Sequence, residues 1–134
     1  MNAYVTDTHA LLWHLSSDPS LSHPAADLFR QAETGAIEIL IPSIVLVEVV
    51  YLCEHHRVPD DRIDRVLALP GAPGSHYRVI PLDEPVVQAM RRIPRKQVPD
   101  MPDRIIGATA LHLDLPLITR DRNLVNSRLL NCVW

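Results

Sequence analysis

The feature of this sequence that most constrains its fold is a regular alternation of short apolar segments with longer helix-like ones. Strands that alternate with helices are typical of α/β folds, in which crossover helices connect parallel strands. The sequence therefore predicts an α/β fold with a mainly parallel sheet. The expected strands lie near residues 3–7, 37–41, 77–81 and 115–119, with a short last strand near 130–133.

Capping residues and helix breakers place helices between these strands. Ser22, Asp60 and Asp100 are suitable N-caps, and Gly35 can end the helix that Ser22 begins. The segment that follows Pro42 is β-branched, but it is too long and too polar at its end for a strand. The expected helices cover residues 8–16, 22–34, 43–56, 60–69 and 84–93, and the last begins at Asp100.

Length and composition predict one domain, spanning residues 1–134. The chain has a mass of 15.1 kDa, and 47% of its residues are hydrophobic, which suits one core. No apolar run reaches the roughly 18 residues that cross a bilayer, so we expect no membrane contact and a soluble, cytoplasmic protein. Cys53 and Cys132 are expected to be reduced thiols.

The charge balance limits how the chain can meet nucleic acid. A net charge of −3 and a pI near 6.1 exclude binding through bulk positive charge, so any such contact must be local. Lys96 is the only lysine, and the arginines concentrate in residues 91–96 and at Arg120, Arg122 and Arg128. Each cluster suits phosphate contact or, equally, a solvated or protein-binding face.

Four acids lie where an α/β fold can bring them together. Asp7 and Asp121 close the first and fourth predicted strands, and ligands of parallel sheets bind beyond the carboxyl ends of strands. Glu48 interrupts an apolar helix, and Asp103 lies in the first turn of another. Clustered carboxylates provide the hard oxygen ligands that Mg²⁺ and Mn²⁺ prefer. This pattern predicts a divalent-metal site.

Each acid also has a simpler explanation. Burying the Glu48 carboxylate among valines is costly, so it needs a partner, either an arginine in a salt bridge or a metal. Strand ends commonly carry Asp for turn formation, which would account for Asp7 and Asp121. Asp100 is interpreted as an N-cap, whereas Asp103 is harder to explain without the other acids.

Other chemistries are not supported by the residues present. The chain has no Gly-x-x-x-x-Gly-Lys-Ser/Thr loop for phosphates and no nucleophile-elbow pattern around its serines. Adjacent His55 and His56 cannot share a helix face, which excludes a zinc pair, and the histidines are expected at the surface or in packing. Trp13 and Trp134 are expected to be core or interface aromatics.

Four segments, 5–13, 42–48, 100–110 and 117–121, resemble in order and spacing the motifs of PIN-domain proteins of the VapC toxin type. The resemblance spans essentially the whole chain. It implies a three-layer α/β/α fold with a parallel sheet, and Mg²⁺-dependent endoribonuclease activity on RNA in which Mn²⁺ can substitute. It also implies a VapB-like antitoxin partner and a homodimer, for which the helices carrying Trp13, Val50, Tyr51 and Cys53 offer apolar surface.

The resemblance assigns catalysis and metal binding to the four acids, in chain order Asp7, Glu48, Asp103 and Asp121. The hydroxyl residues that flank them can order carboxylates or water, and they are Thr6, Thr8, Ser43 and Thr119. Two alternatives remain at this point. One is a PIN module that binds RNA or protein with little activity. The other, an aspartyl phosphotransferase, is disfavoured because His9 stands where such enzymes carry a second Asp.

Overall fold

A five-stranded, all-parallel sheet forms the centre of the molecule in the computed structural model, which describes residues 2–134. The strands are β1 (Asn2–Thr6), β2 (Ile37–Pro42), β3 (Tyr77–Ile80), β4 (Leu117–Ile118) and β5 (Cys132–Val133). Their spatial order is β3-β2-β1-β4-β5, and every neighbouring pair is parallel. The α/β class with a parallel sheet, expected from the sequence, is confirmed.

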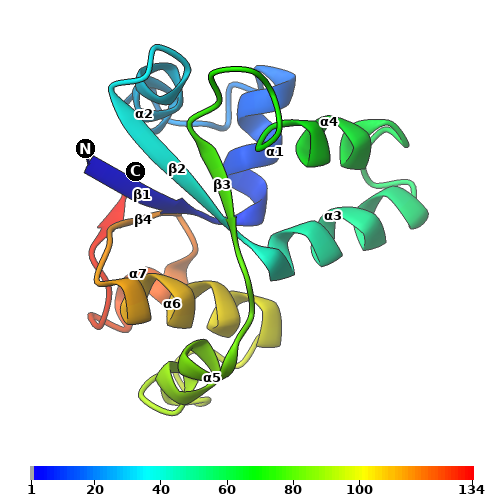
Figure 1. Ribbon diagram of the computed structural model, residues 1–134. Helices are drawn as coiled ribbons and strands as arrows, with labels where there is room; N and C mark the ends of the chain where they lie inside the picture. The colour runs from blue at the N-terminus through cyan, green and yellow to red at the C-terminus, as the bar shows by residue number, and fades with distance from the viewer. Residues whose placement is uncertain (1) are drawn as a thin grey trace.

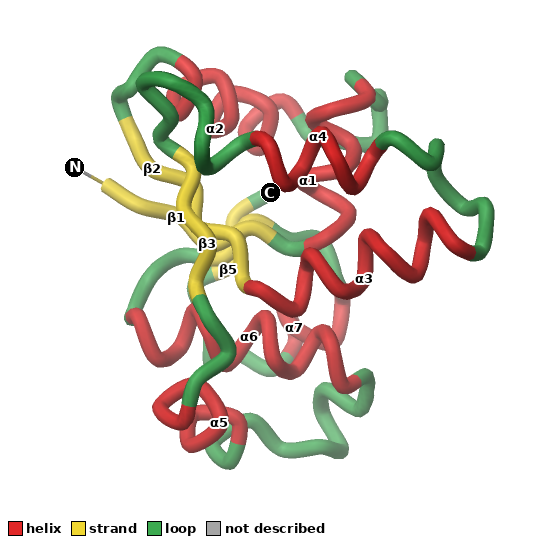
Figure 2. The backbone as a smooth tube through the Cα atoms, turned by 45° about the vertical axis from the view of Figure 1, so that its right-hand side comes forward, coloured by secondary structure: helices red, strands yellow, loops and turns green. Residues whose placement is uncertain are grey.

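Helices cover both faces of this sheet and form the outer layers of an α/β/α fold (Figure 1). α1, α2 and α4 lie on one side, and α5, α6 and α7 on the other. α3 extends away from the sheet and packs against α1, α4 and α6 (Figure 2). The helices are α1 (Thr8–Ser16), α2 (His23–Glu33), α3 (Ser43–Glu54), α4 (Arg62–Ala68), α5 (Glu84–Met90), α6 (Met101–Leu113) and α7 (Arg122–Asn126).

Most predicted elements appear near their expected positions, and three details differ. The fourth strand is only Leu117–Ile118, because β1 and β5 pair with these two residues alone. The residue before α4 is Asp61, which makes no capping side-chain hydrogen bond, so the prediction that Asp60 caps this helix is wrong. Helix α7 was not predicted, since five residues are too few to show helical periodicity.

The core joins the sheet to both helical layers. Val5, Ile39, Phe29 and Ile106 are fully buried, and they come from β1, β2, α2 and α6 respectively. Both cysteines are free thiols, as expected. Cys53 is buried, so it cannot belong to an exposed dimer surface as the sequence suggested. Across residues 2–134, no helix combines the length and apolarity needed to cross a membrane.

The strand order creates a crevice between β1 and β4. The chain passes from β1 outward through β2 to β3, and then returns across the sheet to place β4 on the other side of β1. In parallel sheets, ligand sites form where neighbouring strands lead to connections in opposite directions. The backbone N–H of Asp7 donates to the carbonyl of Ile118 (3.2 Å), which keeps the two strand ends together.

Candidate metal centre

A polar cleft of about 670 Å³ opens at the carboxyl ends of β1 and β4. Five carboxylates line it. Asp7 directly follows β1, and Asp121 comes three residues after the end of β4. The four acids predicted from the sequence are all among them. The lining residues are Asp7, Thr8, His9, Trp13, Glu48, Asp100, Asp103, Arg120, Asp121, Arg122 and Trp134.

Asp7 is held by hydrogen bonds to both of its carboxylate oxygens. As the N-cap of α1, it accepts a bond from the backbone N–H of Ala10 at Oδ1 (2.8 Å). Its Oδ2 accepts a 2.6 Å bond from Oγ1 of the buried Thr119, a residue 112 positions later in the chain. These bonds orient the carboxylate, and they leave only part of its acceptor capacity free.

Asp121 is positioned by the same threonine and by the short helix α7. Its Oδ1 accepts from the backbone N–H of Leu124 (2.9 Å), which makes it the N-cap of α7. The backbone N–H of Asp121 donates to Oγ1 of Thr119 (3.1 Å). Thr119 therefore couples the first and fourth acids, because its hydroxyl donates to Asp7 and accepts from Asp121.

Glu48 reaches the cleft from α3. Thr8, which is buried at the start of α1, donates a 2.5 Å hydrogen bond from Oγ1 to Oε1 of Glu48. The ion pairs found within residues 2–134 join His14 to Glu33, Arg30 to Asp27, and Arg78 to Glu38. Glu48 takes part in none of them. The structural salt bridge left open by the sequence is therefore not its explanation.

The first turn of α6 contributes the remaining two acids. Asp100 is the N-cap of this helix and accepts from the backbone N–H of Asp103 (3.0 Å), as the sequence predicted. Asp103 is partly buried in the cleft wall. Arg104, its neighbour, turns away and donates to the carbonyls of Ile93 and Met90, so it fastens the α5–α6 connection.

Burial and mutual repulsion raise the pKa values of three of these acids. Burial is the largest cause and, with the charges of four neighbouring acids, raises the pKa of Asp103 to about 7. Burial also raises the pKa of Asp7, while the bonds from Thr119 and Ala10 oppose this shift. The pKa of Glu48 is raised in the same way. The cleft therefore holds more negative charge than its surroundings stabilise.

These carboxylates do not by themselves form a closed coordination shell. Within the part of the chain that the structure describes, no three His, Cys, Asp or Glu side chains are arranged to hold an ion. Repulsion keeps like charges apart, and hydrogen bonds already engage oxygens of Asp7, Glu48 and Asp121. Mg²⁺ commonly binds through one or two carboxylates and keeps several waters, which a cleft of this size can admit.

The hydroxyl residues named from the sequence divide into two groups. Thr8 and Thr119 bond to carboxylates, as expected. Thr6 donates to the backbone carbonyl of Asp7 (3.0 Å), not to its carboxylate. Ser43 accepts from the backbone N–H of Leu82 and does not line the cleft, so it contacts none of the carboxylates there.

The sequence did not predict that aromatic and basic residues form a wall of the cleft, although it offered Arg120 and Arg122 as candidate phosphate contacts. His9, Trp13, Arg120, Arg122 and Trp134 all line it, although the tryptophans were expected in the core or at an interface. Two patterns in the sequence point to this wall. His9 and Trp13 are four residues apart, which places them on one face of α1. Both arginines flank Asp121 directly.

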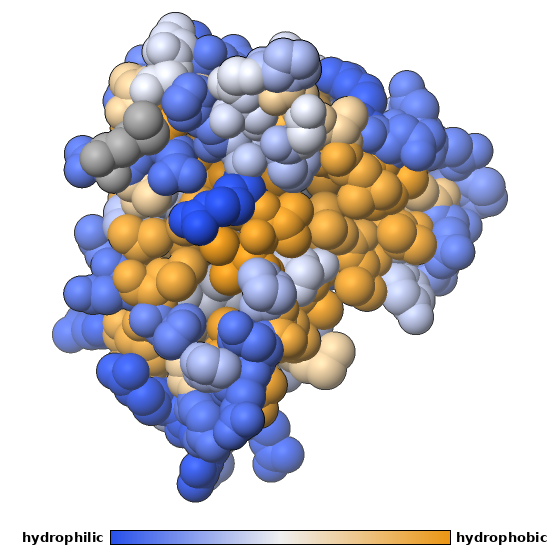
Figure 3. Space-filling view, viewed as in Figure 1, coloured by the Kyte–Doolittle hydropathy of each residue, from blue (hydrophilic) through white to orange (hydrophobic). Residues whose placement is uncertain are grey.

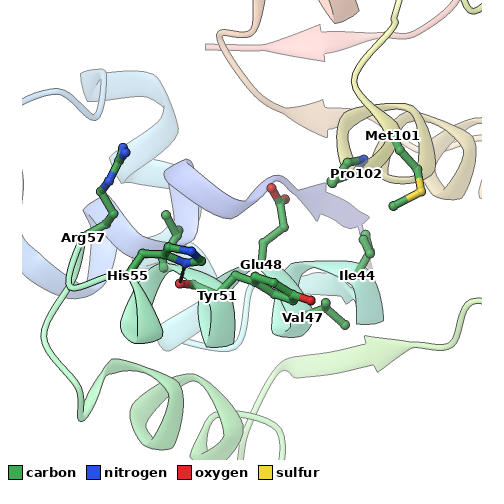
Figure 4. A pocket seen from close by; sticks show the side chains of 9 residues that line it. Ile44, Val47, Glu48, Tyr51, His55, Arg57, Met101 and Pro102 are labelled. Carbon is green, nitrogen blue, oxygen red and sulfur yellow. Dashed lines mark hydrogen bonds between the residues drawn. The ribbon is translucent and has the colours of Figure 1, made fainter.

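An apolar groove of about 490 Å³ adjoins the cleft and shares Glu48 with it. Val47 and Tyr51 on α3 form one side, and Met101 and Pro102 at the start of α6 form the other (Figure 4). The space-filling view shows apolar side chains gathered over α3 (Figure 3). Val47 is 47% exposed, Tyr51 59% and Met101 61%, which is unusual for large apolar side chains so close together.

Known proteins are similar to this chain along nearly its whole length. Ribonuclease VapC22 of Mycobacterium tuberculosis is 26% identical over 133 residues, which cover 96% of this chain and 94% of that protein. VapBC2 of Rickettsia felis, solved bound to a DNA fragment from its promoter, is similar with a TM-score of 0.72 and 15% identity, over 98% of this chain and 97% of that one.

FitAcB of Neisseria gonorrhoeae is a further structural neighbour, with a TM-score of 0.64 and 19% identity, over 98% of this chain and 96% of that one. These structural likenesses show a shared fold. A family model is more specific, because the model of the PIN domain matches residues 4–127, a span that holds all four predicted acids. The chain therefore belongs to the PIN domain family.

Proposed function

We propose that this protein is a metal-dependent endoribonuclease and the toxin of a type II toxin–antitoxin pair. The observation that carries the proposal is the cleft at the carboxyl ends of β1 and β4, which five carboxylates line together. The PIN-family match and the similarity to a ribonuclease of the VapC type support the choice of RNA as substrate.

The donor set of the cleft fits a hard divalent cation. Its carboxylate oxygens suit Mg²⁺ or Mn²⁺, and the raised pKa values of Asp7, Glu48 and Asp103 indicate negative charge that a cation would stabilise. Asp7, Glu48, Asp103 and Asp121 would hold the ion together, one or two of them by direct contact and the others through its bound waters. When bound, it supplies Lewis-acid stabilisation of charge on a scissile phosphate and lowers the pKa of water.

The chain's own residues position the reactants. Thr119 and the N-terminus of α1 fix the Asp7 carboxylate, and Thr8 fixes that of Glu48, so little reorganisation is needed when substrate binds. Asp103 and Glu48 are the candidates to accept a proton from an attacking water, because both line the cleft beside the proposed ion.

The direct test of the proposal is RNA cleavage with and without metal. Asp7→Asn keeps the shape of the side chain but removes its charge, so we expect activity to fall roughly 100-fold or more. This loss exceeds that expected when a residue that only orients a ligand is replaced. Chelation should abolish cleavage, and added Mn²⁺ should restore it. Cleavage of RNA by the purified protein measures both, and mapping of RNA 5′ ends after controlled expression locates the cut sites. Full activity of Asp7→Asn, or activity that survives chelation, would contradict the mechanism.

A second prediction concerns the threonine that joins two of the acids. Thr119→Val preserves shape but removes the hydroxyl that donates to Asp7, so we expect metal affinity and activity to drop roughly 10- to 100-fold. Thr109→Val is the matched control. Thr109 is equally buried, and its hydroxyl bonds only within α6, to the carbonyl of Ile105. Equal losses in the two variants would show a packing effect rather than a role for Thr119 in positioning Asp7.

The raised pKa of Asp103 predicts how stability depends on pH in the metal-free protein. Between about pH 4 and pH 7 the folded state keeps a proton on Asp103 that the unfolded state has lost, so stability falls as pH rises. Asp103→Asn should flatten this fall and melt about 2–8 °C higher at pH 7 without metal. Asp60→Asn, at an exposed acid outside the helices, serves as control for the same chemical change. Thermal melts at several pH values measure this. Melting temperatures of both variants that change with pH as those of wild type do would contradict the prediction.

The partner we propose is an antitoxin that occupies the apolar groove beside Glu48. The exposed side chains of Val47, Tyr51 and Met101 can pack against an amphipathic helix or an extended segment of the partner. The neighbouring carboxylates favour a basic side chain at the end of that segment. Complexes of this kind are named among the structural neighbours. The homodimer expected from the sequence stays a prediction, and exposed Val50 remains available for it.

Charge placed in this groove should separate toxin from partner. We expect Val47→Asp to weaken binding of the protein encoded by the neighbouring small gene by at least about 10-fold. Val87→Asp, on a valine of similar exposure in α5, should bind like wild type. Titration calorimetry with the purified proteins measures both. Unchanged affinity of Val47→Asp would place the partner on another surface.

A further inference from the structure

Arg120 is held at the wall of the acidic cleft by two tryptophans. Its guanidinium carbon lies 4.5 Å from the ring centre of Trp13 and 6.0 Å from that of Trp134. The two indoles meet edge to face, with centroids 6.0 Å apart and planes at 67°. Trp13 comes from α1 and Trp134 follows β5, so two segments far apart in sequence hold this side chain.

Arg120 stands among carboxylates without pairing to one. The three ion pairs found within residues 2–134 do not include it, although the same cleft contains five acids. Outside the cleft, the charge of Arg120 acts on Asp18. Hydrogen bonds from Ser20 lower the pKa of Asp18, and the charge of Arg120 adds a smaller effect. The guanidinium is thus exposed and fixed by aromatic faces rather than by an acid.

A guanidinium held in this way is suited to bind a phosphate. Contact with an indole face stabilises the cation and leaves the N–H donors in its plane free for two parallel hydrogen bonds. Because the side chain is already ordered, less rotamer entropy is lost when an anion binds. An RNA strand that enters the cleft meets strong repulsion from the carboxylates, which a local cation offsets.

We propose that Arg120, positioned by Trp13 and Trp134, binds a backbone phosphate of the RNA strand next to the cleavage site. This inference rests on the proposed ribonuclease function and names the residue that secures its substrate. It also explains how a protein of net charge −3 contacts RNA, since the positive charge needed is local. The other basic cluster, residues 91–96, contributes no residue to the cleft lining.

The experiment measures RNA binding apart from cleavage. In an Asp7→Asn background, a short fluorescein-labelled single-stranded RNA is titrated by anisotropy at several salt concentrations. Arg120→Gln should weaken binding about 10-fold and reduce the slope of log affinity against log salt by about 0.7, the share of one phosphate on a single strand. Arg95→Gln, which removes the same charge from the other basic cluster, should change neither quantity.

Two further variants separate the phosphate contact from simple charge. Arg120→Lys keeps the charge but not the planar pair of donors, so its affinity should lie between wild type and Arg120→Gln. Trp13→Phe keeps an aromatic face and should bind nearly as wild type, whereas Trp13→Leu leaves the charge of Arg120 but loosens its position, so its affinity should also lie between wild type and Arg120→Gln. The chain has only two tryptophans, both at this wall, so their emission should also change when RNA binds.

The outcomes distinguish this inference from the function beneath it. Equal RNA affinity and equal salt slope in Arg120→Gln and Arg95→Gln would overturn the role of Arg120. The proposed function would still hold in that case, because the protein would still bind RNA. No RNA binding and no cleavage by folded wild-type protein would overturn the function. Melting temperatures of all variants show whether each is folded, and little change is expected for the exposed Arg120.

Discussion

The pairing of β1 with β4 is the constraint on which the rest of the site depends. These strands are more than 100 residues apart in sequence, yet Val5 and Thr6 lie in register with Leu117 and Ile118. This register sets Thr119 beside Asp7, so that one buried hydroxyl can donate to the first acid and accept from the backbone of the fourth. A slip of one residue would turn these side chains to the other face of the sheet.

The fold places acids where they are both useful and costly. Asp7, Asp100 and Asp121 each cap a helix, and favourable bonds to backbone N–H groups offset part of their repulsion. The remaining cost is visible in the pKa of Asp103, which burial and its acidic neighbours raise to about 7. The caps let the protein fold with these acids side by side, and the repulsion that remains favours binding of a cation. This is the physical basis of the proposed metal dependence.

Three kinds of surface meet around Glu48 and together account for the proposed activities. The acids form the floor of the cleft, Arg120 and its two tryptophans form one wall, and an apolar groove opens from the side of α3. A substrate phosphate and a partner protein would thus approach the same carboxylates from different directions. Occupation of the groove can therefore control access to the site without any change in the fold.

The sequence alone predicted the fold class, most helices and strands, and four acids that the fold gathers in one cleft, because these features follow from local periodicity, capping residues, strand ends and a carboxylate within an apolar helix. Only the tertiary structure decided which groups surround the acids. The bond from Thr119 to Asp7, the bond from Thr8 to Glu48 and the position of Arg120 between two indoles all join distant segments. Such contacts depend on strand order and helix packing, which local patterns in a single chain do not encode.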